Sequence, residues 1–175
     1  HTTPVVISRA AELGRLEGHQ LFDLEVTPDG RFALAYSSIT LDRWSFQGYS
    51  TVELIYSADG KNWTKPITVM PKAVQVPADC SGRCYYSMVN LDIDDTGKMA
   101  LVASVPNVEQ SRLLVSYSAD GKSWPNPKVL ATSGIFDCGN AQIDSTASDF
   151  VVMYRDCTYR QGSIWYTSRT KTSNG

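Results

Sequence analysis

Apolar and polar residues alternate along most of the chain in short runs, and the runs are separated by residues that favour turns. Runs of this kind, rich in Val, Leu, Ala and Tyr, are typical of strands in antiparallel sheets. The clearest turn signals are Pro28-Asp29-Gly30 and Asp94-Asp95-Thr96-Gly97, with a weaker one at 145–149. Residues 10–18 suit one or two helical turns at most. The pattern therefore predicts an all-β chain.

The expected strands recur with a period close to sixty residues, which is the mark of a repeat architecture. A proline opens one short run in each unit, as suits an outer edge strand that needs no ladder amide. We expect one domain, 1–175, with repeats at about 4–65, 66–126 and 127–175. The predicted strands are 21–27, 32–37, 52–57 and 66–69; 89–94, 99–104, 113–118 and 127–130; and 140–144, 150–155 and 163–168.

The third unit lacks an outer strand of its own when Tyr166 is aligned with Tyr56 and Tyr117. Residues 3–8 have the outer-strand pattern without other strands before them. We therefore expect this N-terminal strand to complete the last sheet, which would also protect an otherwise open edge.

Two octapeptides are nearly identical: Tyr56-Ser-Ala-Asp-Gly-Lys-Asn-Trp63 returns 61 residues later as Tyr117-Ser-Ala-Asp-Gly-Lys-Ser-Trp124. Each aspartate can bond following backbone amides, each glycine permits positive φ, and each tryptophan can anchor the turn. The residues of the two turns are Ser57, Asp59, Gly60 and Trp63, and Ser118, Asp120, Gly121 and Trp124.

These octapeptides resemble the Asp box, the Ser-x-Asp-(x)-Gly-x-x-Trp repeat of sialidases and other bacterial-neuraminidase-repeat β-propellers, in a form one residue shorter. The resemblance implies three four-stranded propeller blades per chain, with the boxes as structural fastenings on the face away from any active site. Because three blades leave the centre of a propeller poorly filled, we expect a homodimer with six blades. Half of a longer protein, or a compact monomer, are the alternatives.

Composition narrows the class of protein. The formal net charge of −2 argues against a nucleic-acid groove, and no apolar run approaches the roughly 20 residues of a membrane span. Four cysteines without zinc-type spacing indicate two disulfides and a secreted protein. We expect Cys138 to pair with Cys157, and Cys80 with Cys84 across a small loop.

The loops opposite the Asp boxes carry aromatic, arginine and carboxylate side chains, which suits sugar binding. The aromatics suit an interface equally well. The candidate ligand-binding residues are Asp42, Arg43, Trp44, Tyr49, Arg155 and Arg160. We expect a lectin-like protein that binds glycans without turnover.

The resemblance also leaves a sialidase-like glycoside hydrolase open, with Arg155, Asp156 and Tyr159 as catalytic candidates, although the Phe-Arg-Ile-Pro motif of sialidases is missing and Arg155 and Asp156 suit an ion pair equally well. A structural or adhesive module is the third hypothesis. We expect no metal and no cofactor. His1 with His19 could bind copper, but a tag remnant explains His1 better.

Overall fold

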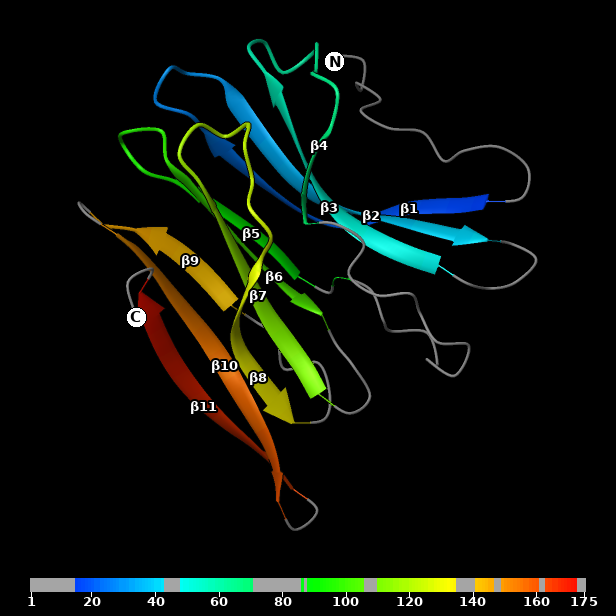
Figure 1. Cartoon of the computed structure of the whole chain (residues 1–175), viewed down its shortest axis with the longest axis vertical. Coiled ribbons are helices and arrows are strands. Elements are labelled where there is room, and N and C mark those ends of the chain that lie inside the picture. Colours follow the sequence, from blue (N-terminus) through cyan, green and yellow to red (C-terminus); the bar gives the residue numbers. More distant parts are fainter. Residues whose placement is uncertain are drawn as a thin grey trace, which may run out of the picture.

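The computed structural model describes the backbone of residues 15–42, 48–70, 86, 88–105, 110–134, 141–146, 149–160 and 163–172. It describes side chains within 22–38, 50–70, 86, 88–105, 112–132, 141–146 and 149–154. These residues form eleven strands in three antiparallel sheets and contain no helix (Figure 1). The all-β prediction is confirmed. No helix of the described residues is long and apolar enough to cross a membrane.

Each sheet is a meander in which consecutive strands are neighbours. The first contains β1 (Arg15–Val26), β2 (Phe32–Asp42), β3 (Gly48–Ser57) and β4 (Ile67–Met70). The second contains β5 (Met88–Ile93), β6 (Met99–Val105), β7 (Gln110–Ser118) and β8 (Lys128–Gly134). The third contains β9 (Ala141–Ser145), β10 (Phe150–Arg160) and β11 (Ser163–Thr172).

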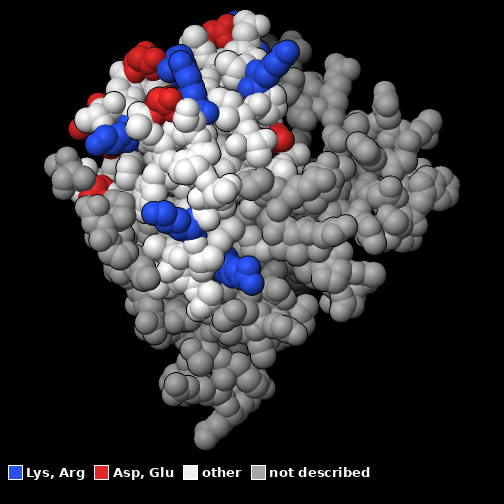
Figure 2. All heavy atoms as spheres, viewed as in Figure 1, with Lys and Arg blue, Asp and Glu red and all other residues white. Residues whose placement is uncertain are grey.

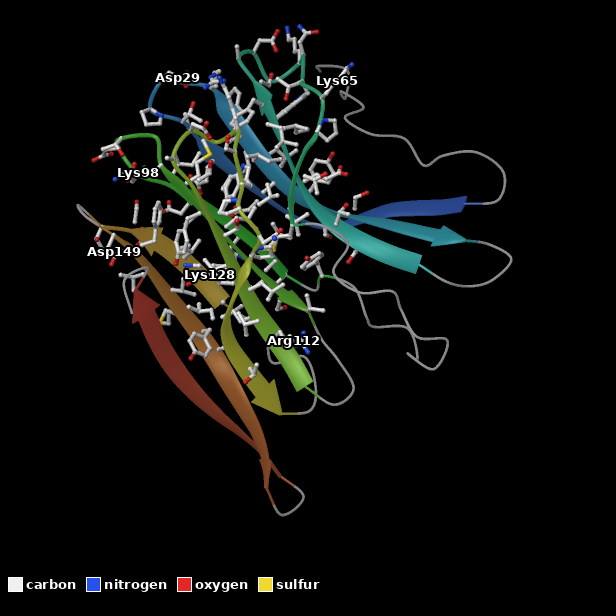
Figure 3. The ribbon with its side chains drawn as sticks, viewed as in Figure 1. Asp29, Lys65, Lys98, Arg112, Lys128 and Asp149 are labelled. Carbon is white, nitrogen blue, oxygen red and sulfur yellow. The ribbon has the colours of Figure 1, made fainter. Side chains whose placement is uncertain are left out.

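The first two strands of each sheet pair in corresponding registers. Their first turns are closed by matching backbone hydrogen bonds, from Thr27 N to Arg31 O at 2.8 Å, from Asp94 N to Lys98 O at 2.9 Å, and from Thr146 N to Asp149 O at 2.7 Å. Asp29, Lys98 and Asp149, labelled in Figure 3, mark these turns along one side of the molecule. The first strands of successive sheets are neighbours: β1 contacts β5, and β5 contacts β9.

Because side chains alternate across a strand, each sheet has two faces. We call face A the face with Phe22 and Leu24 in the first sheet, Val89 and Leu91 in the second, and Ala141 and Ile143 in the third. Face B is the opposite face, with Ala33 and Ala35, Ala100 and Val102, and Val151 and Met153 at matching positions.

The core lies between successive sheets. Face B of the first sheet packs on face A of the second around Leu54, Tyr56 and Leu101, which are all buried. Face B of the second packs on face A of the third around Val115 and Val152. One packing rule thus joins the sheets: face B of one sheet covers face A of the next.

Several strands are longer than the sequence pattern predicted. β1 begins at Arg15, where a helical turn was expected, and β2 and β3 pair as far as Leu41 with Gly48. β10 continues past Arg155 to Arg160, which pairs with Ser163 of β11. Polar residues interrupt the apolar alternation in these stretches, yet the paired backbones satisfy each other across each hairpin.

The alignment of Tyr166 with Tyr56 and Tyr117 is wrong. Tyr56 pairs with Ala33 and Tyr117 with Ala100, whereas the equivalent Val151 pairs with Thr172. Tyr166 instead pairs with Cys157, well before that level of the sheet, because the tight β10–β11 hairpin turns later than expected.

The predictions for residues 3–8 and for Cys80, Cys84 and Cys138 lie outside the described residues. Cys157 was expected to follow the second strand of its sheet. Its backbone lies within β10 instead, and its side chain is outside the described part of the chain.

The twin turns after β3 and β7 have the same geometry. Asp59 Oδ1 accepts hydrogen bonds from the backbone N of Lys61 and Asn62, both at 2.8 Å. Asp120 Oδ1 accepts the equivalent pair from Lys122 and Ser123, also at 2.8 Å. The serine hydroxyl that precedes each aspartate accepts the glycine N–H at 2.9 Å. The carboxylates thus fold back onto the following amides, as the sequence predicted.

The tryptophans of the twin turns differ in their hydrogen bonding. Trp124 packs against the core and its Nε1 donates to Gly121 O at 3.2 Å. Trp63 Nε1 is buried without a hydrogen-bond partner among the described residues.

Acid should weaken both turns, because their backbone N–H groups stabilise the ionised carboxylates. The amides of Ser123 and Lys122 lower the pKa of Asp120 from 3.8 to about 2, and those of Asn62 and Lys61 lower the pKa of Asp59 further. A lowered folded pKa contributes stability above the unfolded value, and that contribution is lost as the pH falls through the folded value.

We therefore expect the urea midpoint of the parent to fall more steeply between pH 4 and pH 2 than that of the double variant Asp59→Asn/Asp120→Asn. Asp95→Asn, which removes one carboxylate at an exposed turn position, is the control for loss of surface charge outside the twin turns. Parallel pH profiles of the parent and the double variant would contradict the prediction.

Candidate functional site

Three of the six predicted ligand-binding residues, Asp42, Tyr49 and Arg160, lie near the sheet ends opposite the twin turns. Phe32 pairs with Ser57 at the twin-turn end of the first sheet, and Leu41 pairs with Gly48 at the other end. Asp42 ends β2, and Tyr49 pairs with Thr40 close to that end. Arg160 ends β10 in the third sheet. In Figure 1 the β2–β3 hairpin extends to the right and the β10–β11 hairpin to the bottom. We call these two hairpin ends together the hairpin rim.

Not all of the predicted residues reach the hairpin rim. Arg43 and Trp44 lie outside the described residues. Arg155 and Asp156 pair with Ser168 and Thr167 in the middle of β10, and Tyr159 pairs with Ile164 nearer the rim. Arg155 was expected to end the second strand, and Asp156 and Tyr159 to lie in the loop after it, but that strand continues through all three. Arg155 is thus separated along β10 from Arg160, with which it was grouped.

The inner strands carry carboxylates that the sequence analysis missed. Glu25, Asp92 and Asp144 occupy matching positions, because they pair with Ala33, Ala100 and Val151. The signal was an acidic residue one position before the end of each first strand. Asp23 adds a fourth carboxylate and ties two sheets together, since its Oδ2 accepts a hydrogen bond from Leu91 N at 2.9 Å.

These carboxylates influence each other. Burial, followed by the charges of Asp23, Asp92 and Asp144, raises the pKa of Glu25 above its ordinary value. Asp92 Oδ2 is buried and has no hydrogen-bond partner within the described part of the chain. A raised pKa keeps a carboxyl group protonated to a higher pH than usual, as general acids require. No group of three His, Cys, Asp or Glu among the described residues has the geometry of a metal site.

Replacing Glu25 by Gln should stabilise the protein at pH 7. The pKa of Glu25 is higher in the folded protein than in the unfolded chain. The folded protein therefore loses stability as the pH rises from the unfolded pKa through the folded pKa and Glu25 ionises. The gain should stay below about 1 kcal/mol, because water screens a group that is mostly exposed. Urea unfolding at pH 7 and at pH 4 tests this, with Asp95→Asn as control. An equal gain at both pH values would contradict it.

In the upper part of the described surface in Figure 2, Lys and Arg side chains lie among Asp and Glu. Lower down, basic side chains stand singly among uncharged residues rather than in a continuous patch. This part of the surface thus offers no continuous positive track of the kind that phosphate backbones require.

No protein-family model matches the chain, and no curated protein sequence matches it. Among solved structures it is similar to the GH32 β-fructofuranosidase BmSUC1 of Bombyx mori, with 17% identity and a TM-score of 0.50, over 86% of this chain and 33% of that one. It is also similar to an N-acetylgalactosamine deacetylase from F. plautii in complex with blood group B trisaccharide, with 14% identity and a TM-score of 0.52, over 90% of this chain and 50% of that one.

At these identities the similarity concerns the fold alone. The chain is an all-β protein of β-propeller-like architecture, built from antiparallel sheets around neighbouring inner strands. It spans between a third and a half of the length of these two structures.

Proposed function

We propose that the chain is a secreted, lectin-like propeller of the Asp-box kind that binds glycans at the hairpin rim. The observation that carries the proposal is the difference between the two ends of the sheets. At one end the aspartates of the twin turns are occupied with backbone amides. The other end carries the β2–β3 and β10–β11 hairpins, together with Asp42, Tyr49 and Arg160, which are not part of the twin-turn motif. Connections held by rigid sheets are common supports for binding sites.

The chemistry of the rim suits sugars. Aromatic rings such as those of Trp44 and Tyr49 stack on the apolar faces of pyranose rings, while arginine and aspartate bond hydroxyl and carboxylate groups. The two similar structures, a β-fructofuranosidase and a deacetylase solved with a trisaccharide, support a ligand of this class.

A glycan array with the parent, Trp44→Ala and Arg160→Ala tests the proposal. We expect both variants to bind the parent's glycans at least about tenfold more weakly, because each loses a direct contact. Lys122→Ala, at an exposed position of the second twin turn, is the control and should bind normally. Undiminished binding by both rim variants would reject the rim as the site.

A sialidase-like glycoside hydrolase is the second candidate, favoured by the raised pKa of Glu25 among the inner carboxylates. Its catalytic residues would be Arg155, Asp156 and Tyr159, as the resemblance implies. A fluorogenic sialoside assay separates the two functions, because only a hydrolase releases the fluorophore. An inactive parent would dispose of the hydrolase. A protein that neither binds glycans nor turns them over would be the structural or adhesive module.

We further propose that two copies form a six-sheet homodimer, with residues 3–8 completing the third sheet. Two disulfides, Cys138–Cys157 and Cys80–Cys84, would suit an extracellular protein. Mass spectrometry of unreduced peptides tests the pairing directly.

A further inference from the structure

The inner strand of the first sheet exposes an apolar row on face A. Phe22, Leu24 and Val26 are 74%, 49% and 56% exposed. Their register equivalents on β5 include Val89 and Leu91, which are 4% and 2% exposed because the first sheet covers them. The row on β1 thus has the composition of an inter-sheet surface without a sheet against it.

The equivalent position on β9 follows the same rule. Ala141, which matches Phe22 and Val89, is 4% exposed and lies in the core between the second and third sheets. Twice within the chain, therefore, this inner-strand row is covered by face B of the preceding sheet.

The third sheet exposes the complementary surface. Met153 on face B of β10 is 52% exposed, while its equivalents Ala35 and Val102 are fully buried. Val152 and Tyr154, its neighbours on face A, are buried against the second sheet. The chain therefore ends its stack of sheets with an exposed β1 row on face A at one side, where Tyr36 and Ile55 on β2 and β3 are buried, and with Met153 exposed on face B at the other.

We propose that the row Phe22, Leu24 and Val26 on β1 is the docking surface for face B of the third sheet, around Val151 and Met153, of a second copy of this chain. The inference rests on the proposed homodimer and assigns its interface. Two such contacts, related by a twofold axis, would close one ring and leave neither apolar surface in water.

The packing within the chain identifies this occupant. Both covered rows, on β5 and on β9, are covered by a face B, and the described residues leave one face B open. Continuing the stack by one step places the third sheet of one copy before the first sheet of the next. A contact between two β1 rows would break this rule and leave Met153 exposed.

Sedimentation and light scattering at micromolar concentration test the assembly first. We expect twice the 19.3 kDa chain mass for the parent. Leu24→Lys and Met153→Glu should each weaken association at least about tenfold, because each would bury an unpaired charge. Val129→Lys is the matched control, since Val129 is 53% exposed on the outer strand β8 and should leave the dimer intact.

Mixing the two charged variants tests which surfaces meet. A heterodimer of Leu24→Lys with Met153→Glu would have one contact with opposite charges and one unaltered contact, so mixing should restore the doubled mass. The assigned interface would be overturned if Leu24→Lys weakened association while Met153→Glu did not. It would also be overturned if the mixture stayed at single-chain mass. Phe22→Lys replaces Leu24→Lys should that variant fail to fold.

The parent mass and the glycan array separate the possible failures. A parent of single-chain mass, or one that forms open polymers, would overturn the dimer and its interface while leaving glycan binding to be judged on the array. A dimer that persists in both charged variants would overturn the interface alone.

Discussion

Gly121→Ala is expected to lower the free energy of unfolding by about 2–5 kcal/mol. Gly121 has a φ of 67°, where a β-carbon costs about 1–2 kcal/mol. The added methyl group would overlap the Tyr56 hydroxyl and approach Met99 Sδ and Cε at 2.9 Å. Both side chains are buried, so relieving the overlap should cost about 1–3 kcal/mol more.

Gly60→Ala is the matched control. Gly60 occupies the same place in the first twin turn, with a φ of 69°, but the nearest atom to an added methyl group is Phe32 Cε2 at 3.8 Å. We expect a loss of about 1–2 kcal/mol, from the backbone conformation alone. Urea unfolding of both variants measures the difference, and equal losses would contradict the packing argument.

The difference arises because the second turn touches the first sheet. The Tyr56 hydroxyl donates a hydrogen bond to Gly121 O at 2.8 Å and lies 3.2 Å from Met99 Sδ. Burial raises the pKa of Tyr56 to about 12, so the hydroxyl remains a donor at neutral pH. The end of β3 is thereby joined to the turn after β7, and a local repeat motif also holds two sheets together.

Tyr117, the equivalent of Tyr56, makes a related contact with the next sheet. Its ring lies 6.1 Å from the ring of Phe150, between centroids, where β10 begins. The two tyrosines therefore connect successive sheets at the same level. The tyrosine recurs in the sequence because each copy contacts the sheet that follows its own.

Much of the fold could be predicted from local chemistry. Asp59 and Asp120 bond the two amides that follow them, and the glycines have the positive φ expected of them. These features involve a few consecutive residues, so their spacing is visible in the sequence. Alternating apolar residues likewise located the middle of most strands.

Pairing between strands was harder to predict. β10 and β11 continue through Arg155, Asp156 and Thr158, where the apolar alternation fails, because each backbone supplies the hydrogen bonds of the other. The same lengthening moved Tyr166 away from the level of Tyr56. The sequence signal for a strand fades where few side chains are buried, but the hairpin does not end there.

The candidate site could also be predicted only in part. The hairpin rim followed from the order of strands, which places alternate connections at opposite ends. The inner carboxylates could not be grouped before the registers were known, since Glu25, Asp92 and Asp144 are separated by unequal lengths of chain. Their mutual influence depends on β1, β5 and β9 being neighbours.

The repeated sheets also provide a matched pair of leucines. Leu24 on β1 and Leu91 on β5 have the same register position on face A, opposite Leu34 and Leu101. Leu24 is 49% exposed and Leu91 is 2% exposed. Their sequence contexts are both alternating strands, so a difference in their contributions to stability must come from the sheet that covers only one of them.

Leu91→Ala should therefore lower the free energy of unfolding by about 3 kcal/mol, through lost burial and the cavity left between the first two sheets. Leu24→Ala should cost less than about 1 kcal/mol when made in the Met153→Glu background, which keeps Leu24 in water by blocking association. Urea unfolding monitored by tryptophan fluorescence measures both, each against its own parent. Similar losses at the two positions would mean that face A of β1 is covered within the single chain.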